Sequence, residues 1–394
     1  MDEVIAHDDQ LRRVMGLRLS AFGESNPERR MLLLAELVQE EQKLGMSPPV
    51  RAVVSDVAAT AGSGSLGNRL GAQTTGLEVS VTLCMNPLPS GILHVLDPKS
   101  DPVLRVKVSN RSRDRRRVRI RAGLESLSTQ MVKTVELERE GAEQGAECTL
   151  SFVPTLLPGA IDHLNEIQRA ALYVISEDLD GRVETHDTHT VVCLSRNSSF
   201  NSVRSGTDGS AVDLTHYYGA WVTPYDESVQ ERIRAAASLC TPKQIWGYQG
   251  KPNNVDRQVE ALFQSLQQHG IKYVNSVIDF GAAAGYATQR TRLPRESLQL
   301  KSANCIDGTV LMASLIEGAS LNPLLAIVPG HAFVGWETWR GSNQWRYLET
   351  TLMESTFEQA CAAGAETYSA FAASGKVRTH SMTNLRRRGI WPMV

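Results

Sequence analysis

The chain has 394 residues, of which 42% are hydrophobic and 21% are charged, and its formal net charge at pH 7 is −2. This length is too great for one ordinary hydrophobic core and predicts two or three domains. The near-neutral charge gives no reason to expect nucleic acid or an anionic membrane as a partner. No apolar run approaches the ~20 residues that an α-helix needs to span a bilayer.

The beginning of the chain, Met1-Asp2-Glu3-Val4, is acidic and lacks the basic and apolar regions of a signal peptide. The six cysteines show no CxxC spacing, which indicates neither a zinc site nor a disulfide framework. His186 and His189 form an HxxH pair, and on a strand this odd spacing turns two side chains to opposite faces. We therefore expect a reduced, cytoplasmic protein without a metal or another cofactor. The cysteines are Cys84, Cys148, Cys193, Cys240, Cys305 and Cys361.

Residues 1–57 are predicted to be helical. Asn26 and Pro27 fit the N-cap and the first position of a helix, and apolar residues recur at helical spacing after them. A helical module of this size suits two roles equally well: an adaptor that recruits a protein partner, or a cap packed on the next domain. Residues 58–76 are rich in glycine, serine and alanine and are predicted to form a flexible linker.

Residues 77–200 are predicted to form a series of short strands. Apolar and basic residues alternate along the second of them, and the return strand directs Arg117, Arg119 and Arg121 outward. Strands at this spacing favour an antiparallel sandwich of immunoglobulin type. The arginines are explained more simply as a solvated face than as a nucleic-acid site, because no aromatic residues interleave with them. The expected strands are 77–83, 103–108, 117–122, 134–138, 148–153, 171–175 and 188–194.

From about residue 214 the pattern changes to a mixture of helices and strands. A helix capped by Asn254 and ended by Gly270 is predicted, followed by a strand over 271–278. Residues 280–300 are then expected to be mostly irregular. Such a long loop inside a compact domain is more often functional than not.

Cys305 is a candidate nucleophile because of its place on a helix. Residues 306–318 predict an apolar helix, so Cys305 lies in or just before the first turn. Unpaired N–H groups and the positive end of the helix dipole are found there, and both favour thiolate over thiol.

His331 and Glu349 are the candidate base and orienting acid. His331 opens a predicted strand, and Glu349 lies near the end of the next one. If the hairpin between them centres on Arg340, the two residues are direct cross-strand neighbours with Cβ atoms ~5 Å apart. The carboxylate would fix the imidazole tautomer and leave the other ring nitrogen for the thiol of Cys305.

The order of these motifs is similar to that of the transglutaminase-like cysteine peptidase superfamily. A cysteine opens an apolar helix in "SANCIDGTVL", a Gly-His pair opens a strand in "VPGHAFVGWE", and an acid ends the next strand in "WRYLETT". The segment resembles bacterial transglutaminase-like proteins in which a sandwich domain precedes the catalytic one, and the resemblance covers residues 77–394. It implies a papain-like α+β fold and an acyl-enzyme on Cys305. The superfamily's acid is usually aspartate, whereas this chain has Glu349.

The oxyanion of an acyl-transfer reaction needs hydrogen-bond donors. The backbone N–H of Cys305 is one, and the resemblance implies a polar side chain upstream of it. Gln289, in the irregular segment, is the candidate for this donor. It fits the role of a solvated loop glutamine equally well.

The sequence thus predicts an α+β multidomain protein with a helical module (1–57), a linker (58–76), an antiparallel β-sandwich (77–200) and a transglutaminase-like catalytic domain (214–394). The favoured function is cysteine-dependent acyl chemistry on peptide or side-chain amides, with proteolysis ahead of deamidation and cross-linking. The alternative is a protein-binding adaptor whose transglutaminase-like domain is inactive. We expect a protein or peptide substrate, a protein partner at the helical module, and neither nucleic acid nor membrane.

Overall fold

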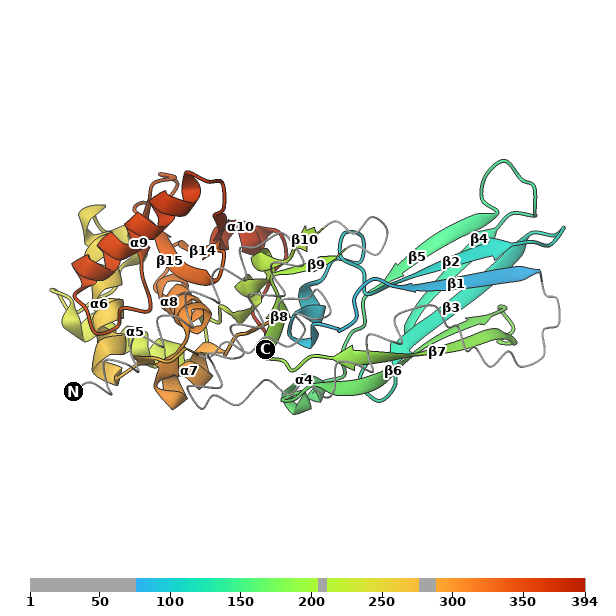
Figure 1. Ribbon diagram of the computed structural model, residues 1–394, viewed down its shortest axis with the longest axis horizontal. Coiled ribbons are helices and arrows are strands. Elements are labelled where there is room, and N and C mark those ends of the chain that lie inside the picture. Colours follow the sequence, from blue (N-terminus) through green and yellow to red (C-terminus); the bar gives the residue numbers. More distant parts are fainter. Residues whose placement is uncertain (1–75, 205–210, 276–287, 394) are drawn as a thin grey trace, which may run out of the picture. The chain divides into compact units, whose positions relative to one another are not determined.

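The computed structural model describes residues 76–204, 211–275 and 288–393. The chain divides into two compact units, Met1–Leu66 and Gly67–Val394, and all described residues belong to the second. The predicted helical module 1–57 lies outside the described residues, as does the linker 58–76 apart from its last residue. The described part is a mixed α and β protein with several antiparallel sheets (Figure 1).

Seven strands in the first half form two antiparallel sheets, one in the order β1-β2-β5 and the other in the order β4-β3-β6-β7. Each strand expected from the alternation of apolar residues overlaps one of these seven. The strands are β1 Leu77–Leu83, β2 Leu104–Asn110, β3 Arg116–Leu124, β4 Met131–Leu137, β5 Glu147–Phe152, β6 Gln168–Glu177 and β7 Val183–Cys193.

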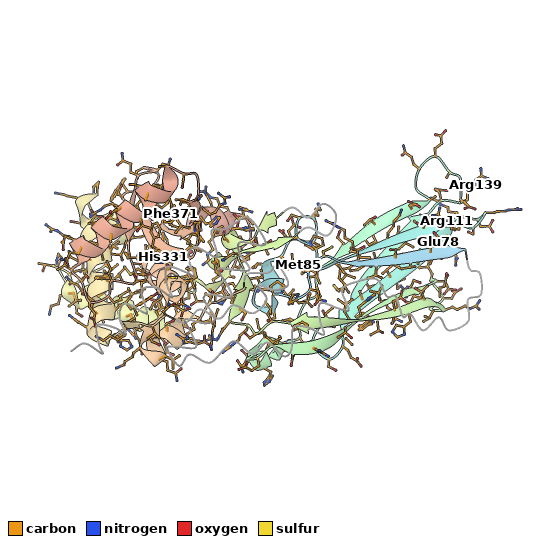
Figure 2. The ribbon with its side chains drawn as sticks, in the orientation of Figure 1. Glu78, Met85, Arg111, Arg139, His331 and Phe371 are labelled. Carbon is orange, nitrogen blue, oxygen red and sulfur yellow. The ribbon has the colours of Figure 1, made fainter. Side chains whose placement is uncertain are left out.

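Ion pairs between strands explain the arginine run. Val118 and Ile120 of β3 are buried, as the alternation predicts. The intervening Arg119 and Arg121 both reach the carboxylate of Glu177 on β6, at 3.1 and 2.9 Å. A similar ion pair lies on the other sheet. There Arg111, directly after β2, has its Nε 2.9 Å from Oε2 of Glu78 on β1 (Figure 2). The arginines therefore belong to a charge-paired sheet surface.

The second half is built around a four-stranded antiparallel sheet in the order β16-β15-β14-β17, with a helix on each face. The strands are β14 Pro323–Val328, β15 His331–Glu337, β16 Trp345–Leu348 and β17 Arg378–Ser381, and the helices are α8 Cys305–Gly318 and α9 Phe357–Ala372.

Strand alternation divides the apolar side chains of this sheet between the two helices. Leu325 and Val334 belong to the core that contains α8, whereas Leu324 and Phe333 pack with Phe371 of α9. All six residues of β14 are buried, as expected for a strand covered on both faces.

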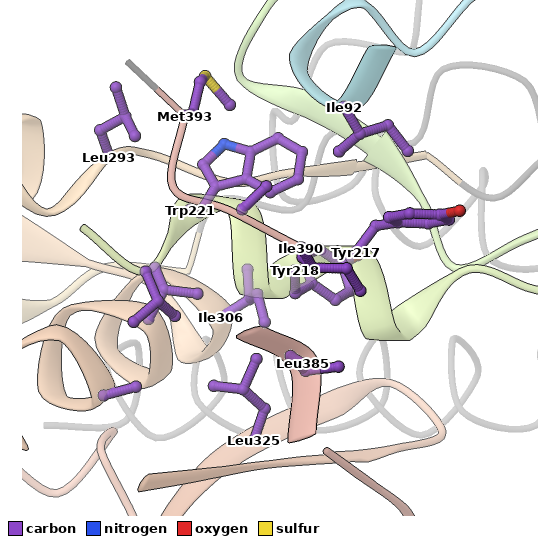
Figure 3. Close-up of a cluster of buried hydrophobic side chains, with 14 of the residues drawn as sticks. Ile92, Tyr217, Tyr218, Trp221, Leu293, Ile306, Leu325, Leu385, Ile390 and Met393 are labelled. Carbon is purple, nitrogen blue, oxygen red and sulfur yellow. The ribbon is translucent and has the colours of Figure 1, made fainter. Parts of the chain in front are cut away.

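The hydrophobic core is continuous from the first half of the described chain to the second. Trp221 is fully buried and lies near Ile92 and Met393 (Figure 3). The backbone N–H of Met393 donates to the Ala220 carbonyl at 2.6 Å, and Tyr217 Oη donates to Asp101 at 2.7 Å.

The remaining elements are η1 Ser90–Val95, α4 Ala160–His163, β8 Ser198–Phe200, β9 Ser202–Arg204, β10 Ala211–Asp213, η2 Thr215–Trp221, α5 Glu227–Leu239, η3 Gly247–Gln249, α6 Asn253–His269, β11 Lys272–Tyr273, β12 Thr288–Arg290, α7 Pro294–Leu300, β13 Ser302–Ala303 and α10 Met382–Arg387.

The described residues between 252 and 300 differ from the sequence expectation in three ways. Asn254 lies inside the first turn of α6 rather than at its N-cap, which is Pro252, although Gly270 (φ +85°) ends the helix as predicted. The strand expected over 271–278 is reduced in its described part to the two residues of β11, which pair only with the short β13.

The prediction that residues 280–300 are mostly irregular is wrong for the second half of this segment, which contains β12 and α7. Pro294 occupies an early position of α7, where its fixed φ favours the helix and its missing N–H costs no hydrogen bond. The Glu296 carboxylate accepts from the Leu293 N–H at 3.1 Å and closes the start of the helix. Residues 280–287 lie outside the described residues.

The contact between α9 and β16 predicts the effect of one substitution. A Cβ added at Gly364 would lie 2.8 Å from the backbone nitrogen of Leu348. Gly364→Ala should therefore lower the free energy of unfolding by about 1–3 kcal/mol, measured by urea denaturation, although alanine is the better helix former. Ala365→Ser, at an exposed position of the same helix, should change it little. A stabilised Gly364→Ala protein would contradict this contact.

Candidate active site

Cys305 is the first residue of α8, and a capping box fixes the turn in which it lies. The Asn304 side-chain oxygen accepts from the Asp307 N–H at 2.8 Å, and Asp307 Oδ2 accepts from the Asn304 N–H at 3.3 Å. The Cys305 carbonyl accepts from Thr309 Oγ1 at 2.7 Å. The sulfur is thus held at the N-terminal end of α8.

Asp307 is a structural group at the start of this helix. Its Oδ1 accepts from the Arg292 N–H at 2.7 Å, and its Oδ2 lies 3.4 Å from the Arg292 guanidinium. Burial raises the pKa of Asp307, whereas the N–H groups of Arg292 and Asn304 lower it. The carboxylate joins the segment before α7 to the first turn of α8.

His331 opens β15 directly after Gly330, which has a φ of +74°. Its Nε2 lies 2.7 Å from Glu349 Oε2, and its ring is close enough to Cys305 for the thiol to affect its pKa. Because Nε2 faces the carboxylate, Nδ1 is the ring nitrogen left for the sulfur. Burial alone would lower the pKa of His331, but the hydrogen bonds and charges of Cys305 and Glu349 outweigh it and raise the pKa to about 10.

Glu349 is buried and comes directly after the last residue of β16. Its second oxygen, Oε1, accepts from the N–H and the hydroxyl of Thr351, at 3.1 and 2.7 Å. Burial would raise the pKa of Glu349, but His331 and Thr351 lower it. Thr351 thus orients the acid, a role that the sequence analysis missed. A hydroxyl residue two places after a carboxylate is the local signal that could have indicated it.

The register of the β15–β16 hairpin differs from the predicted one. Val334 lies opposite Leu348, so the hairpin centres on Gly341 and not on Arg340. If this register is extended past the end of the ladder, His331 and Glu349 are diagonal rather than direct neighbours. The two side chains still meet, because diagonal positions are within reach of long side chains and glutamate is one methylene longer than aspartate.

Gln289 lies on β12, where its backbone pairs with Ser199 of β8. The carbonyl of the next residue, Arg290, accepts from the Asn304 side chain at 3.5 Å, which places this strand against the N-cap of α8. The side chain of Gln289 lies outside the described residues. Its role as an oxyanion donor therefore stays a prediction.

Two tyrosines that the sequence analysis did not consider lie near the sulfur. Tyr218 is buried and its hydroxyl donates to Asn201 at 2.5 Å. Burial raises the pKa of Tyr218, and the charge of Cys305 raises it further. Burial also raises the pKa of Tyr273, together with the charges of Cys305 and Glu349. Each tyrosine is far from Cys305 in the sequence and reaches it only through tertiary packing, so no local pattern indicated them.

The described ranges contain no group of three or more His, Cys, Asp or Glu side chains that could hold a metal ion. His186 and His189 lie on β7 opposite Ile175 and Leu172 of β6. All six cysteines lie in the described ranges and are free thiols. No helix in that part of the chain is long and apolar enough to cross a membrane.

Comparison with known proteins gives little guidance. No family model matches the chain, and no curated protein is similar to it. A crystal structure of a protease candidate from Parabacteroides distasonis is similar to this chain, with 12% identity and a TM-score of 0.21. The match covers 63% of this chain and 66% of that protein, slightly less than two thirds of its length. Two structures of Bacteroides uniformis β-glucuronidases match 62% of this chain and 32% of theirs, with 11% identity and TM-scores of 0.17 and 0.16. Scores this low do not establish a shared fold.

The ionic contacts of His331 predict the effect of removing the acid. Glu349→Gln takes away a charge that favours the imidazolium, so the pKa of His331 should fall from about 10 toward the ordinary value of about 6.5. The measurement is an NMR titration of the protein with ¹³C-labelled histidine. His380, whose pKa is lowered to about 4 by burial, serves as the internal control and should not respond. An unchanged His331 titration would contradict the proposed pairing.

Proposed function

We propose that this protein is a cysteine-dependent hydrolase of the transglutaminase-like peptidase type, acting on amides of proteins or peptides. One observation supports this above all others. Cys305, the first residue of α8, raises the pKa of His331, whose Nε2 lies 2.7 Å from the buried carboxylate of Glu349. A nucleophile, a base and an orienting acid in this order are the elements of covalent amide hydrolysis.

In the proposed reaction the Cys305 thiolate attacks the amide carbonyl carbon. The imidazolium of His331 gives its proton to the leaving nitrogen, the C–N bond breaks, and a thioester remains on the enzyme. Neutral His331 then takes a proton from water as the water oxygen attacks the thioester. The C–S bond breaks, the carboxylic acid leaves as the product, and the thiolate–imidazolium pair is restored.

The oxyanion formed in each step requires donors. The backbone N–H of Cys305 lies in the first turn of α8 and has no acceptor within the helix. We propose it as one donor and the side chain of Gln289 as the other. Glu349 stays ionised throughout, and its contacts with Thr351 hold it toward the ring.

The acyl acceptor distinguishes the three related activities. Water gives proteolysis or deamidation, whereas a lysine amine gives cross-linking. We propose proteolysis, so incubation with a cell extract should create new peptide N-termini, and a biotinylated primary amine should not be incorporated into protein. Cys305→Ala should abolish the new N-termini. Incorporation of the amine that depends on Cys305 would instead identify a transferase.

We propose that the parts of the chain divide the work. The strand order β1-β2-β5 and β4-β3-β6-β7 fits an immunoglobulin-like sandwich with seven strands in two sheets. Residues 77–200 would form this sandwich and residues 214–394 the catalytic domain. Residues 1–57 would recruit a protein partner or cover the next domain.

Alkylation tests whether Cys305 is activated. Iodoacetamide should modify it rapidly at pH 6, where an ordinary thiol is almost wholly protonated. His331→Ala should slow this modification at pH 6 by at least about tenfold and should have a smaller effect at pH 9, because only the thiolate reacts. Peptide mass spectrometry gives the rate at each cysteine separately.

Cys84 and Cys240 are the internal controls. Both are partly buried, burial raises the pKa of each, and both should therefore react slowly at pH 6. If Cys305 reacts no faster than these two, and His331→Ala leaves its pH profile unchanged, the hydrolase proposal is wrong. The adaptor with an inactive transglutaminase-like domain would then be the better account.

A further inference from the structure

Strand β11 is fastened to the segment that leads into the candidate nucleophile. It runs parallel to β13, and the Lys272 N–H donates to the Lys301 carbonyl at 2.9 Å. One residue beyond the strand, the Val274 N–H donates to the Ala303 carbonyl, also at 2.9 Å. Because Ala303 lies only two residues before Cys305, these hydrogen bonds hold β11 beside the start of α8.

An ion pair connects the same strand to the segment that follows the acid. Lys272 Nζ is paired with the carboxylate of Glu354, which lies three residues after Thr351. Both partners are exposed, so the pair adds little stability. It nevertheless places β11 between the two segments that supply Cys305 and Glu349.

Tyr273, on β11, has an exposed aromatic ring and lies close to the candidate active site. Its side chain is 44% exposed, and the next residue, Val274, is 46% exposed. Successive residues of an extended strand point to opposite faces. Burial raises the pKa of the Tyr273 phenol, and the charges of Cys305 and Glu349 raise it further, which agrees with a ring on the side of these two groups. Val274 then points to the other side.

We propose that Tyr273 is a specificity-determining residue, whose exposed ring packs against an aromatic or other apolar side chain of the substrate next to the reacting amide. This inference rests on the proposed function. Aromatic rings prefer to pack against one another in stacked or edge-to-face arrangements. An acidic side chain is disfavoured there, because a thiolate, an imidazolium and the Glu349 carboxylate together have one net negative charge.

Two alkylating agents of different shape test the proposal at Cys305 itself. Iodoacetamide is small, whereas N-benzyliodoacetamide adds an aromatic ring to the same reactive group. The measured quantity is the ratio of their rate constants at Cys305, divided by the same ratio for free glutathione. The wild-type ratio should exceed one, and Tyr273→Ala should lower it by about fivefold, because the ring–ring contact is lost. Tyr273→Phe, which keeps the ring, should restore it.

Val274→Ala is the matched control, since it removes a similarly exposed side chain from the residue directly after β11, on the opposite side. Its ratio should equal that of the wild type. An unchanged ratio in Tyr273→Ala, or an equal loss in Val274→Ala, would overturn the inference while iodoacetamide still selects Cys305. If iodoacetamide does not select Cys305 in the wild-type protein, the proposed function fails, and the inference fails with it.

Discussion

The burial of helix α8 is the constraint on which the site depends. All residues from Ile306 to Ile316 are buried, so the helix has no solvated face and is held from every side. The sheet of β14 and β15 covers one side of it, and α5, α6 and α7 contact it as well. A helix confined in this way cannot rotate or slide without opening the core. The position of Cys305 at its first residue is therefore set by packing along the whole helix.

The first turn of α8 also touches the segment that contains the acid. A Cβ at Gly308 would lie 2.9 Å from Thr350 Oγ1, so glycine is required for this close approach. Thr350 Oγ1 in turn lies 3.4 Å from the Cys305 carbonyl, within hydrogen-bond distance. The segments that contain Cys305 and Glu349 are thus held together by the close approach of Thr350 to the first turn of α8, and His331 contacts Glu349 from the start of β15.

Two buried carboxylates at this place differ because their partners differ. Asp307 is surrounded by the N–H groups of Asn304 and Arg292 and by a guanidinium, all of which belong to the scaffold. Glu349 uses one oxygen for Thr351 and the other for the imidazole of His331. The same chemical group therefore fastens a helix in one case and orients a reactive side chain in the other.

The sequence by itself determined the strands of the first half, the helix that Cys305 opens and the strand that His331 opens. The alternation in β1 to β7, the apolar run of α8 and the start of β15 at His331 depend on near neighbours, and these are visible in any short window. The hairpin register was decided by the loop, where Gly341 and Asn343 adopt positive φ and move the centre by one residue. Only tertiary structure placed Tyr218 and Tyr273 around the site, because contacts between distant segments follow from packing and leave no periodic signal in the sequence.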